Sequence, residues 1–167
     1  LAMKTKFKNI LIGITFLFSA FIFAEQSSKK VYVVPIQDVI DLGIPGLVNR
    51  AIDLAETDNA SLIIFDIDTF GGRVDAATQI KDSISSTEIE TIAFINRRAI
   101  SAGSLISLSC DQIYMTDGAT IGATSVVDMS GSKQSEKSQS YMREEMAATA
   151  EKSGKNPDIA RGMVDEE

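Results

Sequence analysis

The sequence predicts an α/β fold built on a parallel sheet, and two patterns indicate it. First, short apolar runs alternate along the chain with segments whose apolar residues recur every three or four positions, as strands and helices do. Second, the run at 61–66 is apolar without alternation from Leu62 to Phe65, which is typical of a strand buried on both faces of a parallel sheet. We therefore expect strand–helix–strand units with right-handed crossovers.

The individual elements follow in order along the chain. Apolar and β-branched runs predict strands at 31–36, 61–66, 91–95 and 112–115. Helical spacing predicts helices at 45–57, 75–85, 101–109 and 141–153, the first opened by Pro45 and the last ended by Gly154. We expect a solvated loop at Arg97 and Arg98, a turn at Gly122, and a mobile loop rich in Ser, Gly and Lys at 128–140.

Composition excludes several classes of function. The chain has 167 residues, enough for one domain, and it contains no histidine and a single cysteine, Cys110. A Ser-His-Asp triad, a Cys-His pair, an imidazole metal site and an internal disulfide are therefore excluded, and no metal or cofactor is predicted. The net charge of −7 leaves no electrostatic basis for binding nucleic acid.

The first 24 residues have the layout of a targeting segment. Three lysines lie within 4–8, and a largely apolar stretch of about 15 residues follows at 10–24. This stretch is short for a bilayer span, which needs roughly 20 residues. We predict that residues 1–24 are a secretory signal peptide, with an uncleaved N-terminal membrane anchor as the alternative. Either role exports the acidic remainder of the chain.

A double glycine, Gly71-Gly72, follows the predicted strand at 61–66. Adjacent glycines let the backbone turn sharply and expose amide N–H groups. Two such donors aimed at one point would form an oxyanion hole, which stabilises the negative oxygen of an acyl-transfer intermediate. An ordinary strand-to-helix turn is the alternative, because Gly-Gly turns are common.

Ser101 lies where the predicted strand at 91–95 gives way to a helix. At a helix N-terminus the dipole favours a developing alkoxide, and the small neighbours Ala102 and Gly103 would let a substrate backbone approach. Ser101 is therefore a candidate nucleophile, and a simple N-capping serine is the alternative. Serines deeper in the helix, Ser104, Ser107 and Ser109, are poorer candidates.

A serine nucleophile needs a base, and without histidine a lysine is the candidate. Lys137 lies near the entry to the last predicted helix, where burial and the positive helix end would depress the pKa of its amine. Lys133, further out in the loop, is the rival. A solvated surface lysine is the alternative role for both.

These segments together resemble the NfeD family of membrane-associated serine proteases of the ClpP class. The resemblance covers about residues 30–164 and rests on five segments in order: Thr69-Phe70-Gly71-Gly72, Ser101-Ala102-Gly103, Asp111-Gln112-Ile113-Tyr114-Met115, Ile121-Gly122-Ala123 and Gly154-Lys155-Asn156. It implies a ClpP/crotonase-like fold of repeated ββα and βαβ units. By the same register, the catalytic lysine of the family corresponds to Lys137 rather than Lys133.

The resemblance also implies an activity. Ser101 and Lys137 would form a Ser-Lys dyad, and Gly71, Gly72 and Ala102 would form the oxyanion hole, with no cofactor or metal. The expected substrate is an apolar segment of a polypeptide, with a stomatin-like membrane protein as partner. We expect a homo-oligomer at the periplasmic or extracytoplasmic membrane face. Residues 30–167 would be the protease domain, truncated before the C-terminal membrane helices and OB-like domain of long family members.

The sequence departs from the family pattern at three places. Phe70 stands where proline is usual, no proline follows Ile121-Gly122-Ala123, and the loop before Lys137 is unusually polar. These departures motivate an alternative, a catalytically inactive scaffold of the same fold that binds a membrane partner. A crotonase-type acyl-thioester enzyme and a signal-peptide peptidase are two further alternatives, of which export disfavours the first.

Overall fold

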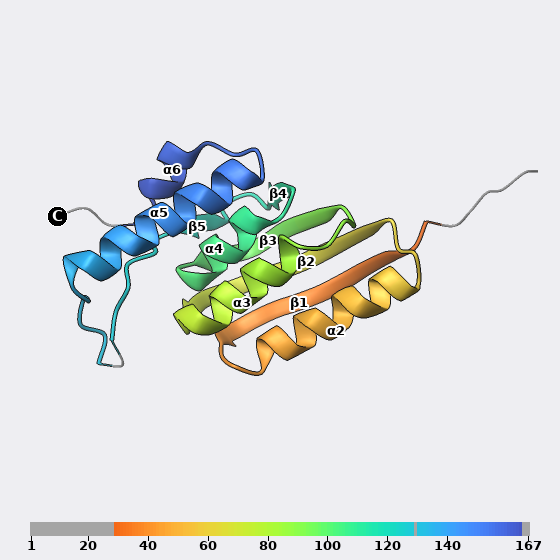
Figure 1. Ribbon diagram of the computed structural model, residues 1–167, viewed down its shortest axis with the longest axis horizontal. Coiled ribbons are helices and arrows are strands. Elements are labelled where there is room, and N and C mark those ends of the chain that lie inside the picture. Colours follow the sequence, from red (N-terminus) through yellow and green to blue (C-terminus); the bar gives the residue numbers. More distant parts are fainter. Residues whose placement is uncertain (1–28, 129, 165–167) are drawn as a thin grey trace, which may run out of the picture.

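The computed structural model describes residues 29–128 and 130–164, so the predicted targeting segment 1–24 lies outside the described part. Ten elements follow one another in the order shown in Figure 1. They are β1 (Val31–Ile40), α2 (Ile44–Thr57), β2 (Leu62–Gly72), α3 (Val74–Ile84), β3 (Thr91–Ile100), α4 (Ala102–Ser109), β4 (Gln112–Met115), β5 (Thr120–Gly122), α5 (Glu136–Lys152) and α6 (Pro157–Arg161). The predicted α/β class and parallel sheet are confirmed.

One five-stranded sheet organises the described residues, and every pairing in it is parallel. The main path runs β1-β2-β3-β4, and β5 pairs with the end of β3 beyond β4. Because the strands are parallel, their carboxyl ends meet at one edge of the sheet. The ends of β2 and β3, at Gly72 and Ile100, are therefore neighbours at that edge.

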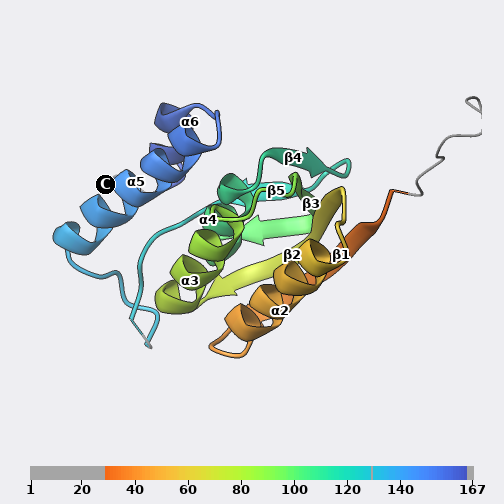
Figure 2. The same ribbon diagram turned by 45° about the vertical axis from the view of Figure 1, so that its right-hand side comes forward.

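Helices α2, α3 and α4 lie side by side along one face of the sheet, as Figures 1 and 2 show. The sheet residues that point toward them are fully buried, among them Ile36, Ile63, Phe65, Ile67 and Ile95. The apolar stripe of each helix faces this layer, which explains the helical spacing in the sequence. Burial of these side chains fixes the sheet edge where the strands end.

Helix α5 packs against α4 and carries α6 beside it, so the last part of the chain forms a separate layer (Figure 2). Met142, Met146 and Ala150 of α5 are buried on its inner side. Lys81 of α3 and Glu145 of α5 make an ion pair of 2.7 Å with both side chains more than four-fifths buried. Within the described residues, no helix has the length and apolar content to cross a membrane.

Several boundaries differ from the sequence prediction. Strand β3 continues to Ile100, so Arg97 and Arg98 lie in a strand rather than a solvated loop; both make ion pairs with Asp68 of the neighbouring strand. The segment predicted as a mobile loop contains an antiparallel bridge between Val127 and Lys133, and α5 begins at Glu136 rather than at 141. Strand β5 and helix α6 were not predicted.

Candidate functional site

Ser101 occupies a strained backbone position between β3 and α4. Its φ and ψ are 55° and −115°, a combination uncommon for a residue with a side chain. The Ser101 amide donates to the carbonyl of Gly122 at 2.9 Å, which ties the serine to the end of β5. Its hydroxyl makes no hydrogen bond with any residue that the structure describes, and it does not cap α4. The alternative of a capping serine is therefore wrong.

The double glycine lies directly against Ser101. Gly71 has a φ of 106°, and a Cβ added there would lie 2.7 Å from Cβ of Ser101 and 3.2 Å from N of Ala102. A Cβ on Gly72 would lie 2.2 Å from the carbonyl oxygen of Ile40 in β1. Only glycine fits at either position. The turn is therefore built for a close approach of backbone to the serine.

The N–H groups of Gly71 and Gly72 differ in whether they already have a hydrogen-bond partner. The Gly71 N–H donates to Oγ1 of Thr69 at 2.9 Å, so the structure gives it an internal partner. Arg73 N donates to the carbonyl of Ile40, and amides alternate in direction along a parallel ladder, so the Gly72 N–H points away from β1. The Ala102 N–H is the first of α4 and has no acceptor within the helix. Gly72 and Ala102 thus offer the two amides suited to an oxyanion.

Ser104 supports the site instead of reacting in it. Its hydroxyl is fully buried, donates toward the carbonyls of Ala99 and Gly122 at 2.7 and 2.9 Å, and accepts from Gly122 N at 2.9 Å. This network fastens the end of β3 to β5 through α4. The carbonyl of Gly122 also receives the Ser101 amide, so Ser104 helps to hold the candidate nucleophile in place.

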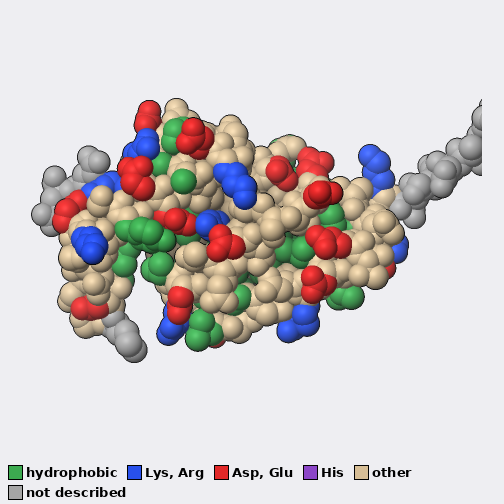
Figure 3. Space-filling view, in the orientation of Figure 1, with side chains coloured by type: hydrophobic (Ala, Val, Ile, Leu, Met, Phe, Trp, Pro, Cys, Tyr) green, Lys and Arg blue, Asp and Glu red, His purple; other side chains and the backbone are tan. Residues whose placement is uncertain are grey.

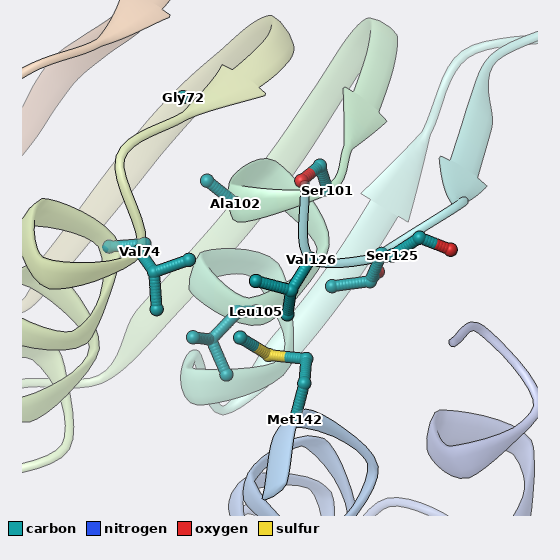
Figure 4. A pocket seen from close by; sticks show the side chains of 10 residues that line it. Gly72, Val74, Ser101, Ala102, Leu105, Ser125, Val126 and Met142 are labelled. Carbon is teal, nitrogen blue, oxygen red and sulfur yellow. The ribbon is translucent and has the colours of Figure 1, made fainter. Parts of the chain in front are cut away.

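A pocket opens beside Ser101, and Figure 4 shows the side chains that surround it. It lies between the N-terminus of α4, the start of α3, the segment after β5 and the side of α5. Its lining is mostly apolar: Gly72, Val74, Ala77, Ser101, Ala102, Leu105, Thr124, Ser125, Val126 and Met142. The space in which the centre of a water molecule can move is about 20 Å³. Such a pocket suits a small group attached to a chain that passes Ser101.

Lys137 lies in an adjoining groove, in the first turn of α5. The groove is lined by Val74, Val126, Lys137, Ser138, Tyr141 and Met142, so it shares three walls with the Ser101 pocket. Figure 3 shows hydrophobic side chains gathered at the edge of a hollow where α5 faces α3. The Lys137 side chain is exposed and has no hydrogen bond or ion pair among the described residues. Lys137 does not line the pocket beside Ser101, and no hydrogen bond joins the two side chains.

Gln139 is a site residue that sequence reasoning missed. It is fully buried, its Oε1 accepts from Val126 N at 2.9 Å, and its Nε2 donates to Val126 O at 2.7 Å. The amide thus pairs with the backbone of Val126 as a neighbouring strand would. Because Val126 lines both the Ser101 pocket and the Lys137 groove, Gln139 holds a wall that the two hollows share. A glutamine among polar residues gave no signal in the sequence.

Phe70, one of the departures from the family pattern, points away from this pocket. Its ring is 72% exposed, and the guanidinium of Arg98 lies 4.3 Å from the ring centre. The side chain does not line the pocket beside Ser101. The described residues contain no group of three or more Cys, Asp or Glu side chains placed to hold a metal ion.

Comparison with solved structures identifies the architecture. The 1510-N membrane-bound stomatin-specific protease of Pyrococcus horikoshii, solved in complex with a substrate peptide, superposes with a TM-score of 0.77 at 31% identity. The match covers 83% of this chain and 67% of that one. ClpP1 from Listeria monocytogenes superposes with a TM-score of 0.64 at 21% identity over 81% of this chain and 79% of its own, which shows the shared fold alone. The predicted ClpP-like fold is confirmed.

Sequence relatives point the same way. Membrane protein NfeD1b of Bacillus subtilis is 36% identical over 162 residues, which is 95% of this chain and 37% of the relative. Membrane-bound protease PH1510 of Pyrococcus horikoshii is 33% identical over 142 residues, covering 80% of this chain and 32% of the relative. The chain thus spans about a third of the length of these relatives. The model of the NfeD1b N-terminal domain matches residues 30–167, and the chain therefore belongs to the NfeD1b family.

Proposed function

We propose that the chain is the protease domain of an exported serine endopeptidase, with Ser101 as nucleophile and Lys137 as base. The observation that carries the proposal is the setting of Ser101. A strained serine, whose hydroxyl has no hydrogen-bond partner among the described residues, lies at a helix N-terminus, against a double-glycine turn and beside a small pocket. The likeness to a stomatin-specific protease supports the protease class.

In this proposal the Ser101 hydroxyl attacks the carbonyl carbon of a peptide bond while its proton passes to the neutral amine of Lys137. The Gly72 and Ala102 amides stabilise the oxyanion. When the C–N bond breaks, the leaving amine takes the proton from Lys137. Water then attacks the acyl-enzyme, gives a proton to Lys137, and releases the carboxylic acid as Ser101 regains its hydrogen.

The proposal requires Lys137 to approach Ser101 from the adjoining groove. The two hollows share Val74, Val126 and Met142, so the amine has a continuous path along apolar walls. A substrate chain lying in the groove would cover the lysine and exclude water from it. The same apolar walls suit apolar segments of a membrane-associated polypeptide, and we propose a stomatin-like protein as the partner.

We propose a second candidate function because Lys137 is exposed and lines the adjoining groove, not the pocket beside Ser101. An inactive scaffold would keep the fold and bind a membrane partner without turnover. Export to the outer face of a membrane and assembly into a homo-oligomer are further parts of the proposal. The layout of residues 1–24 supports export, and the family resemblance supports assembly. Sedimentation of the full chain across a range of concentrations tests the assembly.

The deciding experiment incubates the full chain with an apolar-peptide panel, beside Ser101→Ala, Lys137→Ala and Lys133→Ala variants. We expect cleavage by the parent and by Lys133→Ala, and losses of at least about a thousandfold in kcat for the other two. Circular dichroism confirms that each variant is folded. Binding without cleavage by any folded form would favour the scaffold, and cleavage that survives Lys137→Ala would place the base elsewhere.

A further inference from the structure

Thr69 is a buried polar residue near the end of β2 that takes no part in the proposed reaction. It is 1% exposed, and its hydroxyl makes two hydrogen bonds. The hydroxyl donates to the carbonyl of Asp38 in β1 and accepts from the Gly71 N–H at 2.9 Å. Its one donor and one of its acceptor sites are therefore used inside the fold, and both partners are backbone groups.

The backbone of β1 is irregular where it meets this hydroxyl. The register of the β1–β2 pairing shifts between Gln37 and Val39. At the shift, Asp38 has a φ of 61°, which a residue with a side chain rarely adopts. The Asp38 carbonyl accepts the hydrogen bond of the Thr69 hydroxyl. A side-chain hydrogen bond thus joins the two strands where the regular ladder is interrupted, just before the double glycine.

The hydrogen bond from Gly71 restrains the glycine turn. Glycine has more backbone freedom than any other residue, so the peptide groups on either side of it need a partner to keep one orientation. The Thr69 hydroxyl holds the Gly71 N–H, and the next peptide along the chain carries the Gly72 N–H. That N–H is one of the two amides suited to an oxyanion. Its direction therefore depends on the hydroxyl of Thr69.

The methyl group of Thr69 contacts the other half of the site. Gly103 is the second residue of α4, and a Cβ added there would lie 2.6 Å from Cγ2 of Thr69. The other two neighbours of such a Cβ would lie at 3.5 Å or more, in ordinary contact. The first turn of α4, which carries the Ala102 N–H, is thus in close contact with Thr69. Figure 4 shows Gly72 at the end of β2 and Ala102 at the start of α4.

We propose that Thr69 is a positioning residue that sets the two oxyanion donors, the amides of Gly72 and Ala102, relative to each other. The hydroxyl orients the first donor through Gly71, and the methyl group sets how closely α4 approaches and so places the second. Both donors have to lie about 2.7–3.1 Å from the same oxygen to stabilise it. This inference rests on the proposed function, because it assigns a further residue to the same reaction.

Two substitutions separate the hydroxyl from the methyl group. Thr69→Val keeps the shape and removes the hydroxyl, whereas Thr69→Ser keeps the hydroxyl and removes the methyl. We expect kcat for peptide hydrolysis by the full chain to fall about a hundredfold in Thr69→Val, as after loss of one oxyanion donor, and at most about tenfold in Thr69→Ser, with KM unchanged. A residue that only fills space would give the opposite order, because serine leaves a cavity and valine does not. That order would overturn the inference.

Thr91 provides the matched control. It is a threonine 2% exposed, and its hydroxyl donates to Oδ2 of Asp111 at 2.8 Å and accepts from Asp111 N at 3.0 Å. It begins β3, whereas Ser101 follows the other end of that strand. Thr91→Val therefore makes the same chemical change at the opposite edge of the sheet and should keep the kcat of the parent per folded molecule. An equal fall in kcat for Thr91→Val and Thr69→Val would overturn the inference.

An exchange of size between two positions tests the methyl contact. Gly103→Ala should lower kcat at least about tenfold, because its Cβ collides with the Thr69 methyl and displaces the start of α4. Thr69→Ser removes that methyl, so the double variant should recover to within about threefold of Thr69→Ser alone. Thr69→Val keeps the methyl and should restore nothing. No recovery in the double variant with serine would refute the role of the contact.

Hydrogen exchange measures the positioning without any turnover. The Gly71 amide should exchange faster in Thr69→Val than the change in global stability explains, and it should stay protected in Thr69→Ser. This result together with no cleavage by the parent would support the positioning and refute the protease. Cleavage by the parent together with an unchanged kcat in Thr69→Val would refute the positioning and support the protease.

Discussion

Two features restrict position 71 to glycine, a positive φ and a close contact with Ser101. Their effects on stability can be measured separately. Gly71 and Gly118 both have positive φ, 106° and 79°, but a Cβ at Gly118 would meet nothing within 4 Å. At Gly71 it would collide with Cβ of Ser101. Backbone strain alone costs roughly 1–3 kcal/mol. We expect Gly71→Ala to lower the free energy of unfolding in urea by about 1–3 kcal/mol more than Gly118→Ala does.

The same pair of variants also reports on the site. The collision at Gly71 would displace Ser101 and the Ala102 amide. The rate of peptide hydrolysis by Gly71→Ala should therefore fall by much more than the loss of folded protein explains. Gly118→Ala, remote from the pocket, should keep the activity of the parent per folded molecule. Equal losses of stability in the two variants would contradict the close contact.

Residues whose role depends on their place in the backbone were predictable from the sequence. The two glycines end β2 and Ser101 follows β3, and parallel strands end at one edge, so their proximity could be expected. Gln139 could not be found in this way. Its role arises from burial against partners elsewhere in the fold, and the polar composition around it predicts only a loop.

At the scale of elements, the apolar pattern predicted β1 to β4 and α2 to α5, and it missed the short elements β5 and α6. It failed where polar contacts extend an element. Arg97 and Arg98 continue β3 because Asp68 of β2 pairs with both side chains. The first turn of α5 contains Lys137 and no apolar stripe, and the pairing of Gln139 with Val126 anchors it to the body of the domain.

The contact between α3 and α5 should depend on pH. Burial is the largest single influence on the pKa of Lys81 and lowers it, but hydrogen bonds and charges from Asp82 and Glu145 outweigh burial and raise the pKa above its ordinary 10.5. A raised pKa in the folded state means that the ammonium stabilises the fold in full below pH 10.5. This stabilisation is lost as pH rises through the raised value.

We therefore expect the free energy of unfolding of the parent to fall above about pH 10.5 relative to that of Lys81→Arg. Arginine keeps its charge there because its pKa lies above about 12, so the variant retains the ion pair with Glu145. Urea unfolding between pH 8 and pH 12 on the full chain makes the comparison, and other titrating groups cancel in the difference. Parallel curves for the two proteins would show that the Lys81 pair contributes no pH dependence.

At the scale of the whole molecule, the site draws on segments between Gly72 and Met142 that several strands and helices separate along the chain. Strands β2 and β3 supply the glycine turn and the serine, the segment after β5 supplies Thr124 and Val126, and α5 supplies Met142. The sequence contains no direct sign of how α5 lies against α3 and α4, because that depends on contacts such as Lys81 with Glu145. For this reason the position of Lys137 relative to Ser101 could not be predicted from spacing.

The last two described residues are Met163 and Val164, and Met163 contacts the segment after β5 that lines the site. After α6, Val164 is 1% exposed, and the carbonyl of Met163 accepts the Thr124 amide at 2.8 Å. Packing of Val164 therefore holds the turn at Gly122–Thr124, whose Gly122 carbonyl in turn accepts the Ser101 amide. A small cavity at Val164 should loosen the site from a position outside the pocket lining.

We expect Val164→Ala to lower the free energy of unfolding by about 1–2.5 kcal/mol, since it deletes two buried methyl groups. Hydrogen exchange of the Thr124 amide should accelerate by more than the loss of global stability explains, because the Met163 carbonyl loses its anchor. Ile159→Ala is the matched control, an aliphatic residue on α6 that is 64% exposed, and it should change neither quantity. If the Thr124 amide exchanged no faster in Val164→Ala than the change in global stability predicts, packing of Val164 would not restrain the site.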